Sequence, residues 1–260
     1  MNNEFDCTAS IVIYKNPPDM IRKAADSFLN TGINVKLYII DNSPTPDLKT
    51  AFEGLSVAYH FMGENVGYGR AHNWAIEQAG KSRYHFILNP DILIHEGVIE
   101  ALMQFMDSNP DVGMVCPKVL NADGSIQYLN KRHTTVYDLF LRRFLPKKIR
   151  PFFQKRLDYY EMKDMGYDSV YNVPFVTGAF MFCRTSILKE VGGFDPRYFM
   201  YFEDADLSRK FQIKGYRTVY YPHVSVTHLW ERASHKSAKM AFVLIANGIR
   251  YFNKWGWKIL

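Results

Sequence analysis

Cysteine is scarce in this sequence of 260 residues, which holds only Cys7, Cys116 and Cys183. They lie far apart without CxxC spacing, which argues against a disulfide framework and structural zinc and favours a reducing compartment. Long apolar runs are missing too, because the longest, Met240 to Ile249, is too short to span a bilayer. The N-terminal residues also lack the apolar core of a signal peptide. We therefore expect a cytoplasmic protein without a transmembrane segment.

Two glycine-rich phosphate-binding motifs are absent as well. Gly63, Gly67 and Gly69 follow the third predicted strand and do not have GxGxxG spacing, and no GxxxxGK[ST] sequence occurs. Those motifs place backbone N–H groups against phosphates in dinucleotide-binding and P-loop proteins. Their absence argues against a dehydrogenase and against a P-loop enzyme.

The composition fits one large globular domain. Hydrophobic residues make up 47% and charged residues 22% of the chain, which provides for a sizeable core and excludes a disordered or collagen-like protein. The net charge of +6 favours an anionic partner, such as nucleic acid, a nucleotide or a membrane surface.

The first half of the chain alternates short β-branched apolar runs with segments of helical periodicity. Strands are predicted at Ala9–Tyr14, Val35–Ile40, Val57–Met62, Tyr84–Leu88 and Gly113–Cys116, and helices at Asp19–Leu29, Gly67–Ala79 and Gly97–Met106. Strands that alternate with helices pack as a mostly parallel central sheet with helices on both faces. The predicted fold class is therefore α/β.

Polar clusters follow three of these strands, at residues 41–43 (DNS), 64–70 (ENVGYGR) and 89–91 (NPD). Each cluster taken alone is typical of a turn, because Asn, Asp, Gly and Pro are the usual turn residues. In open α/β sheets, however, ligands bind at the carboxyl ends of the strands, where all three clusters lie. Together they favour a nucleotide pocket.

Asp91 stands directly after a predicted buried strand. A carboxylate there can hold a divalent cation on substrate phosphates, because Mg²⁺ typically takes one or two protein carboxylates plus phosphate oxygens. The alternative is that Asp91 only ends the strand in a proline turn.

The densest acidic cluster follows the apolar run Phe199 to Phe202 and consists of Glu203, Asp204 and Asp206. Acids beside an apolar wall suit general-base chemistry, because partial desolvation raises the pKa of a carboxylate towards neutral. The same acids would also fill the first turn of a helix that runs to Lys214, where they favour the helix dipole. Both can hold, with Asp206 in a capping or positioning role and Asp204 free to act as the base.

Two residues of the second half are weaker candidates when taken alone. Gly178, in the strand-like run 176–182, would let a substrate approach the backbone closely. His228 lies in the strand-like stretch 224–230, where a lone histidine is more often structural than a ligand.

Most of the positive charge falls in two segments. Arg142 to Arg156 holds seven basic residues and no acid, interleaved with aromatic side chains, and residues 232–260 hold six basic residues and no acid. Subtracting both from +6 leaves −7 on the rest of the chain. Basic residues mixed with aromatics suit an anionic membrane interface or nucleic acid, and the alternative is an ordinary solvated loop. We expect Lys236 to Gly248 to form an amphipathic core helix, with Trp255 and Trp257 beyond it as typical interface anchors.

In their order along the chain, six motifs resemble the glycosyltransferase family 2 enzymes of the GT-A fold. They are IIDNS, ENVGYGRAHN, LNPD, GAFMFCR, GGFDPRYFMYFEDADL and VTHLW, and the resemblance runs from Ser10 to Trp230. Within that family the chain is similar to bacterial rhamnosyltransferases that build O-antigen and related cell-surface polysaccharides. We expect a single GT-A (Rossmann-like) domain with four parts: a nucleotide-sugar-binding half (1–120), a basic and aromatic insertion (121–172), an acceptor and catalytic half (173–235) and a C-terminal amphipathic helix (236–260).

The resemblance implies roles for individual residues. Asp204, in a pair with Glu203, would be the catalytic base, and Asp91 would hold the metal on the donor diphosphate, assisted by His228. The commoner metal motif of the family is Asp-x-Asp, and neutral Asn89 stands at its first position. Asp41 would contact the base or ribose of the nucleotide. The expected nucleotide-sugar-binding residues are Tyr14, Asp41, Asn65, Gly67, Asn73, Asn89 and Gly178.

The implied activity is inverting, metal-dependent transfer of a sugar onto a glycan or a polyprenyl-diphosphate-linked acceptor. The expected donor is dTDP-rhamnose and the expected cofactor is Mg²⁺ or Mn²⁺. The alternatives are UDP-galactose, UDP-glucose or UDP-N-acetylglucosamine as the donor, or a non-catalytic nucleotide-sugar-binding protein. Peripheral contact with the inner face of the cell membrane is expected, and a nucleic-acid partner is not.

Overall fold

The structure is a computed structural model that describes residues 5–146, 148–229 and 238–260. Its strands are β1 (Cys7–Ile13), β2 (Val35–Asp41), β3 (Val57–Phe61), β4 (Tyr84–Leu88), β5 (Ile92–Ile94), β6 (Val112–Leu120), β7 (Tyr171–Asn172), β8 (Phe180–Arg184) and β9 (Arg217–His228). Its α-helices are α1 (Pro18–Leu29), α2 (Tyr68–Gln78), α3 (Val98–Ser108), α4 (Val136–Phe144), α5 (Gln154–Tyr160), α6 (Thr185–Glu190), α7 (Glu203–Ile213) and α8 (Ala238–Trp255). The short 3-10 helices are η1 (Asp47–Phe52), η2 (Arg150–Phe153) and η3 (Lys163–Met165). Lys147, Trp230 and Lys236 of the predicted segments lie outside the described residues.

The strands form one mixed sheet in the order β3-β2-β1-β4-β8-β6-β9-β5, and β7 also pairs with β9. The expected parallel arrangement holds from β3 to β4, whereas β8 is antiparallel to both of its neighbours, β4 and β6. The long segment after β6 returns the chain to the carboxyl end of β4, so β8 starts from that edge and runs the opposite way. The α/β class is therefore confirmed, with a sheet that is parallel in only part of its width.

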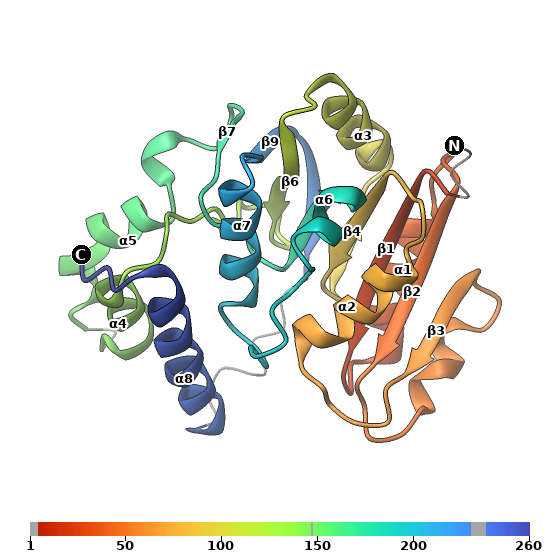
Figure 1. Ribbon diagram of the computed structural model, residues 1–260, viewed down its shortest axis with the longest axis horizontal. Helices are drawn as coiled ribbons and strands as arrows, with labels where there is room; N and C mark the ends of the chain where they lie inside the picture. Colours follow the sequence, from red (N-terminus) through yellow and green to blue (C-terminus); the bar gives the residue numbers. More distant parts are fainter. Residues whose placement is uncertain (1–4, 147, 230–237) are drawn as a thin grey trace.

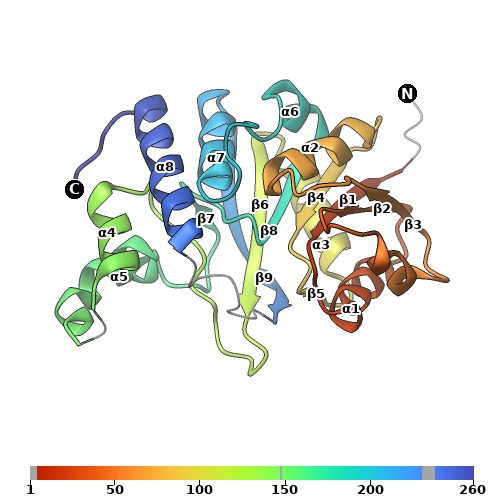
Figure 2. The same cartoon turned by 90° about the horizontal axis from the view of Figure 1, so that it is seen from below.

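The central strands are buried on both faces, which explains why they are almost entirely apolar. Phe86 and Phe182 pack on one face against α1 and α3, while Ile87 and Met181 pack on the other face against α2, α6 and α7. Figure 2 shows the two helix layers on opposite sides of the sheet. Because side chains alternate between the two faces, neighbouring residues of one strand pack against different helix layers.

The 121–172 segment and α8 lie together at the end of the molecule far from β3 (Figure 1). At the start of α4, the N–H of Val136 donates to the carbonyl oxygen of Lys258, beyond the end of α8. α8 is also tied to α7, because Lys254 Nζ lies 2.7 Å from Oδ1 of buried Asp206. These contacts make the segment and the C-terminal helix one structural unit beside the sheet.

The described part of α8 has one buried side and one exposed side. Tyr251 and Phe252 are buried, but Phe242 is 72% exposed, and Ile245 and Ile249 on the same stripe are exposed as well. α8 packs on the outside of α4 and α7 and not between two layers, so the described part of the helix is covered on one side only.

Candidate active site

The carboxyl ends of β1 to β4 lie side by side. Asp41 at the end of β2 is in register with Ile13 of β1 and Phe61 of β3, and Leu88 at the end of β4 pairs with Ile11. The side chains that follow these strands therefore share one edge of the sheet, which is where open α/β folds bind ligands.

Three of the predicted nucleotide-sugar-binding residues lie at this edge. Asp41 is buried and accepts a 2.5 Å hydrogen bond from the Tyr59 hydroxyl. Burial, and then that bond, raise the pKa of Tyr59. Tyr14 is half exposed, and exposed Asn65 uses its Oδ1 to accept from the N–H of Gly67 at 3.1 Å. Asp41 therefore holds the strand ends together, while Tyr14 and Asn65 are accessible to a ligand.

The start of α2 is locked against the loop that leads to α7. Gly67 has a φ of 91°, and a Cβ there would lie 2.5 Å from the carbonyl oxygen of Phe199, so glycine is required. Asn73 on the same helix makes two 2.8 Å hydrogen bonds to the backbone of Phe194, one as donor to its carbonyl and one as acceptor from its N–H. Both residues thus shape the site by holding backbone in place.

Replacing Asn73 with Ala is expected to destabilise the fold by about 1–3 kcal/mol, because the N–H and carbonyl groups of Phe194 lose their partners. A lower melting temperature in scanning calorimetry would show this. Glu77→Ala, on the exposed part of the same helix, is the matched control and should melt close to the unmodified protein. Equal losses in both variants would contradict a specific role for Asn73.

Asp91 and His228 meet because β5 pairs with β9, with Ile92 opposite His228. Asp91 Oδ1 and His228 Nε2 are 3.1 Å apart, and both side chains are buried. On the other side of the ring, His228 Nδ1 lies 2.9 Å from Oε1 of Gln127, whose amide nitrogen donates to the His228 carbonyl. Because the amide nitrogen is engaged, Oε1 must accept, so Nδ1 carries the proton and Nε2 faces Asp91.

This pair fits a divalent cation. Within the described residues, neither Asp91 Oδ1 nor His228 Nε2 has a hydrogen-bond partner, so buried lone pairs face each other. A cation would satisfy both atoms, as would a second proton on the ring. Residues 5–146, 148–229 and 238–260 contain no metal-competent group of three or more His, Cys, Asp or Glu side chains. A metal here would therefore take its remaining ligands from substrate phosphates and water, which is the usual coordination of Mg²⁺.

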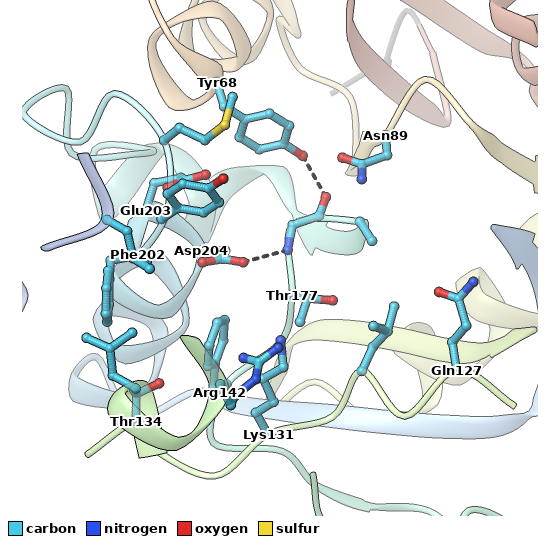
Figure 3. A pocket seen from close by; sticks show the side chains of 18 of the residues that line it. Tyr68, Asn89, Gln127, Lys131, Thr134, Arg142, Thr177, Phe202, Glu203 and Asp204 are labelled. Atoms are coloured by element: carbon cyan, nitrogen blue, oxygen red, sulfur yellow. Dashed lines mark hydrogen bonds between the residues drawn. The ribbon is translucent and has the colours of Figure 1, made fainter. Parts of the chain in front are cut away.

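A cavity of about 430 Å³ opens beside this pair (Figure 3). The predicted residues that line it are Asn89, Gly178, Glu203, Asp204 and His228. The predicted residues outside its lining are Tyr14, Asp41, Asn65, Gly67, Asn73 and Asp91. The structure thus brings the expected catalytic acids and the histidine to one cavity, while most of the expected nucleotide contacts lie apart from it.

Asp204 reaches this cavity from the first turn of α7. Its Oδ2 accepts from the N–H of Gly178 at 3.0 Å, and its Oδ1 accepts from the N–H of Ala205 at 2.9 Å. Burial raises the pKa of the Asp204 carboxyl, and the Gly178 bond and the charge of Lys131 oppose that rise. A carboxylate with a raised pKa that faces a cavity is suited to accept a proton as a general base.

Glu203 lies on the same cavity wall. Burial, and then the charge of Asp204, raise the pKa of Glu203 well above its ordinary value. The two residues before it, Tyr201 and Phe202, have φ angles of 72° and 71°. Left-handed backbone at non-glycine residues costs of the order of 1–3 kcal/mol and is concentrated at functional sites. The loop therefore presents the two acids at the expense of backbone strain.

Gly178 provides room for Tyr68. A Cβ at this position would lie 3.2 Å from the Tyr68 hydroxyl oxygen, which donates a 2.6 Å hydrogen bond to the Gly178 carbonyl. Burial, and then the charges of Glu203 and Asp204, raise the pKa of Tyr68 well above its ordinary value. In this structure Gly178 packs against a tyrosine and orients Asp204 through its N–H.

Among the lining residues that sequence reasoning missed are Tyr68, Gln127, Lys131 and Arg142. Tyr68 lies inside a motif that was singled out, and an aromatic ring among polar residues is the signal that could have found it. Gln127 and Lys131 come from the irregular stretch between β6 and α4, where no periodicity indicates a partner. Arg142 falls in the basic segment, which the charge pattern places on the surface.

A family model described as "Glycosyltransferase like family 2" matches residues 49–243. The chain is 28% identical over 235 residues to the N-acetylglucosaminyl-diphospho-decaprenol L-rhamnosyltransferase of Mycobacterium tuberculosis, covering 84% of this chain and 74% of that protein. It is 22% identical over 227 residues to rhamnosyltransferase WbbL of Escherichia coli, covering 84% of this chain and 81% of that protein.

Two solved structures resemble the fold as a whole. GalNAc-T7 with UDP, GalNAc and Mn²⁺ superposes with a TM-score of 0.70 at 14% identity and covers 97% of this chain. The mannosyltransferase PcManGT of Pyrobaculum calidifontis, in complex with GDP-Man and Mn²⁺, gives a TM-score of 0.61 at 16% identity and covers 96%. The chain spans 48% and 64% of the length of these two proteins. This likeness shows the GT-A fold.

Proposed function

This chain belongs to glycosyltransferase-like family 2 and is a glycosyltransferase, and on that premise we propose that it moves rhamnose from dTDP-rhamnose onto a polyprenyl-diphosphate-linked acceptor. The observation that carries the chemistry is half-buried Asp204, which faces the cavity that His228 also lines. The similarity to the rhamnosyltransferase of M. tuberculosis supports the donor, and that relative's name supports the acceptor class. The product would belong to a bacterial surface polysaccharide.

In the proposed reaction, Asp204 takes the proton of the acceptor hydroxyl as that oxygen attacks the anomeric carbon from the face opposite the leaving diphosphate. One displacement inverts the anomeric configuration and leaves no sugar on the enzyme. Asp91 and His228 would hold Mg²⁺ or Mn²⁺, with Asn89 two residues before Asp91 at the same strand end. When bound, that ion stabilises the charge of the nucleoside diphosphate. The edge beside Asp41 would receive the nucleotide.

A panel of nucleotide sugars tests the donor. The protein would be incubated with dTDP-rhamnose, UDP-galactose, UDP-glucose and UDP-N-acetylglucosamine, each with and without Mn²⁺. We expect slow hydrolysis of dTDP-rhamnose and a higher melting temperature with that donor alone, because a ligand that binds only the folded state stabilises it. If a UDP-sugar has these effects and dTDP-rhamnose does not, the rhamnose donor is wrong and the family stands.

We also propose that the α4, η2 and α8 end of the molecule contacts the membrane that carries the acceptor. Exposed apolar side chains gather on these elements, among them Phe140 and Phe144 on α4, Phe152 on η2 and Phe242 on α8. Basic Arg150 lies within the same segment. Within the described residues, no helix combines the length and the apolarity needed to cross a bilayer. A basic surface with exposed aromatics favours binding at an anionic lipid interface.

Flotation with vesicles checks this contact. The protein should rise with vesicles that contain phosphatidylglycerol at low salt and less with phosphatidylcholine alone. Phe152→Ser should weaken binding roughly tenfold, because burial of a phenylalanine side chain contributes about 1.5–3 kcal/mol. Ile213→Ser, which removes an exposed apolar side chain from α7, is the matched control. No flotation with anionic vesicles, or equal weakening in both variants, would contradict the proposed membrane face.

A further inference from the structure

We infer that Lys131 and Arg142 form a binding site for the diphosphate of the acceptor, in the same cavity as Asp204 but apart from the Asp91–His228 pair. This inference rests on the proposed transfer to a lipid-linked acceptor and adds the residues that would recognise it. It is carried by two cations that line the cavity without a carboxylate partner, next to an apolar wall.

Lys131 is a buried basic side chain that lines the cavity. Its side chain is 9% exposed, and its Nζ lies 5.2 Å from the ring centroid of Phe175. Among the ion pairs of the described residues, none includes Lys131. Burial, and then the charge of Arg142, lower the pKa of Lys131 to about 7, although Asp204 and Glu161 act in the opposite direction. A buried ammonium group is costly without a counter-ion, so the position favours an anion from outside the chain.

Arg142 adds a second positive charge to the same part of the cavity. It projects from α4, and its guanidinium carbon lies 5.5 Å from the ring centroid of Tyr160. The described residues provide no ion pair for it. Figure 3 shows Arg142 next to Lys131, and its charge is one of the causes that lower the lysine pKa. Two neighbouring cations repel each other unless an anion lies between them, and a diphosphate with its several charged oxygens suits both.

The position of this cationic site assigns it to the acceptor. The Asp91–His228 pair, at the strand ends, is where the donor diphosphate would lie. Lys131 and Arg142 come from the 121–172 segment instead, and Figure 3 shows them away from Asn89, below Asp204 and Thr177. Because Asp204 must touch the acceptor hydroxyl, an anion bound at these two cations, apart from the donor diphosphate, belongs to the acceptor.

An apolar wall next to the two cations would contact the hydrocarbon chain of the acceptor. Leu129, Leu139, Phe175 and Leu244 line the same cavity, two of them from α4 and α8. The residues that follow Leu139 and Leu244, which are Phe140 and Ile245, are exposed on the outer surface of those helices. A diphosphate at Lys131 and Arg142 would thus place its hydrocarbon chain along this wall, towards the proposed membrane face.

Binding of octyl diphosphate tests the site directly. Calorimetry would be performed in the presence of a chelator, so that the ligand cannot bind through a metal at Asp91 and His228. We expect binding to the unmodified protein and a loss of about tenfold or more in Lys131→Met, because hydrogen bonds to charged groups are worth more than neutral ones. Arg142→Gln, which changes an exposed side chain, should show a comparable loss. Lys81→Met, an exposed lysine before β4, is the control and should bind like the unmodified protein.

Two outcomes would overturn the inference: no binding of octyl diphosphate to the unmodified protein, or binding by Lys131→Met and Arg142→Gln that is as tight as binding by the unmodified protein. Because the assay uses neither donor nor metal, it does not depend on the rhamnose assignment. Binding that requires Lys131 in a protein that does not use dTDP-rhamnose would leave the site standing and the donor wrong. If the protein transfers rhamnose but binds octyl diphosphate equally well without Lys131, the donor assignment would stand and the site would be wrong.

Discussion

Replacing Asp204 with Asn is expected to reduce sugar transfer by roughly 10²–10⁴-fold, the usual contribution of a general base. The amide keeps the shape of the side chain, including an oxygen that can accept from the N–H of Gly178, but it cannot take up the proton of the acceptor hydroxyl. Donor binding should persist, because Asp204 does not hold the nucleotide in the proposed arrangement. Turnover at saturating substrates and calorimetric titration of the donor would separate the two effects.

Asp206→Asn is the matched control for this substitution. It makes the same chemical change two residues further along α7, where the carboxylate pairs with Lys254 and accepts from the Trp255 indole. This variant should melt at a lower temperature but turn over normally per folded molecule. Full activity in Asp204→Asn, together with loss of activity in Glu203→Gln, would move the base to Glu203.

The pH profile of the unmodified enzyme should agree with this role. Burial raises the pKa of the Asp204 carboxyl, and a general base works only when deprotonated. Turnover should therefore fall as the pH decreases through that raised pKa, at a higher pH than an exposed aspartate would give. Lys131→Met removes a charge that opposes the rise, so the acidic limb of the profile should move to higher pH.

Local patterns in the sequence predict the first half of the fold well, for physical reasons. The strand expected at Tyr84–Leu88 is observed with the same ends, and those at Val35–Ile40 and Val57–Met62 differ by one residue. These strands are largely apolar runs bounded by turn residues, so the burial pattern and the turn residues indicate the same strand ends. β5, with three residues, is too short to show a period. β8 runs antiparallel because the long segment after β6 returns the chain to the far end of β4. No local sequence pattern predicts where such a segment returns.

In the candidate site, too, features formed by neighbouring residues could be predicted from local patterns, and contacts between residues far apart along the chain could not. Glu203 and Asp204 are recognisable because the aromatic run and the acids that create the cavity wall are consecutive in the sequence. The Asp91–His228 contact depends on the pairing of Ile92 with His228, which are far apart along the chain. Only the family resemblance indicated that contact. Lys131 reaches the cavity through an isolated bridge to Phe175, and neither pattern nor resemblance pointed to it.

Replacing Asp91 with Ala should weaken metal-dependent donor binding by roughly a hundredfold or more, because a bound cation contributes several kcal/mol of charge stabilisation. The variant would lose the buried carboxylate that faces His228 Nε2 at 3.1 Å and so one of the two protein ligands proposed for the metal. Calorimetric titration with dTDP-rhamnose, with and without Mn²⁺, measures the effect. Without metal, Asp91→Ala and the unmodified protein should bind the donor with similar, weak affinity.

Gln127→Leu is expected to weaken metal binding at the same site less than Asp91→Ala does. Gln127 is not one of the proposed metal ligands, but its Oε1 accepts from His228 Nδ1 at 2.9 Å and so keeps the Nε2 lone pair directed at Asp91. Loss of such an orienting partner typically costs 10–100-fold in metal affinity. We therefore expect an Mn²⁺ affinity between those of the unmodified protein and Asp91→Ala. If the addition of Mn²⁺ enhances donor binding in Asp91→Ala as much as in the unmodified protein, the metal is held elsewhere, and the Asp91–His228 pair is an ordinary ion pair.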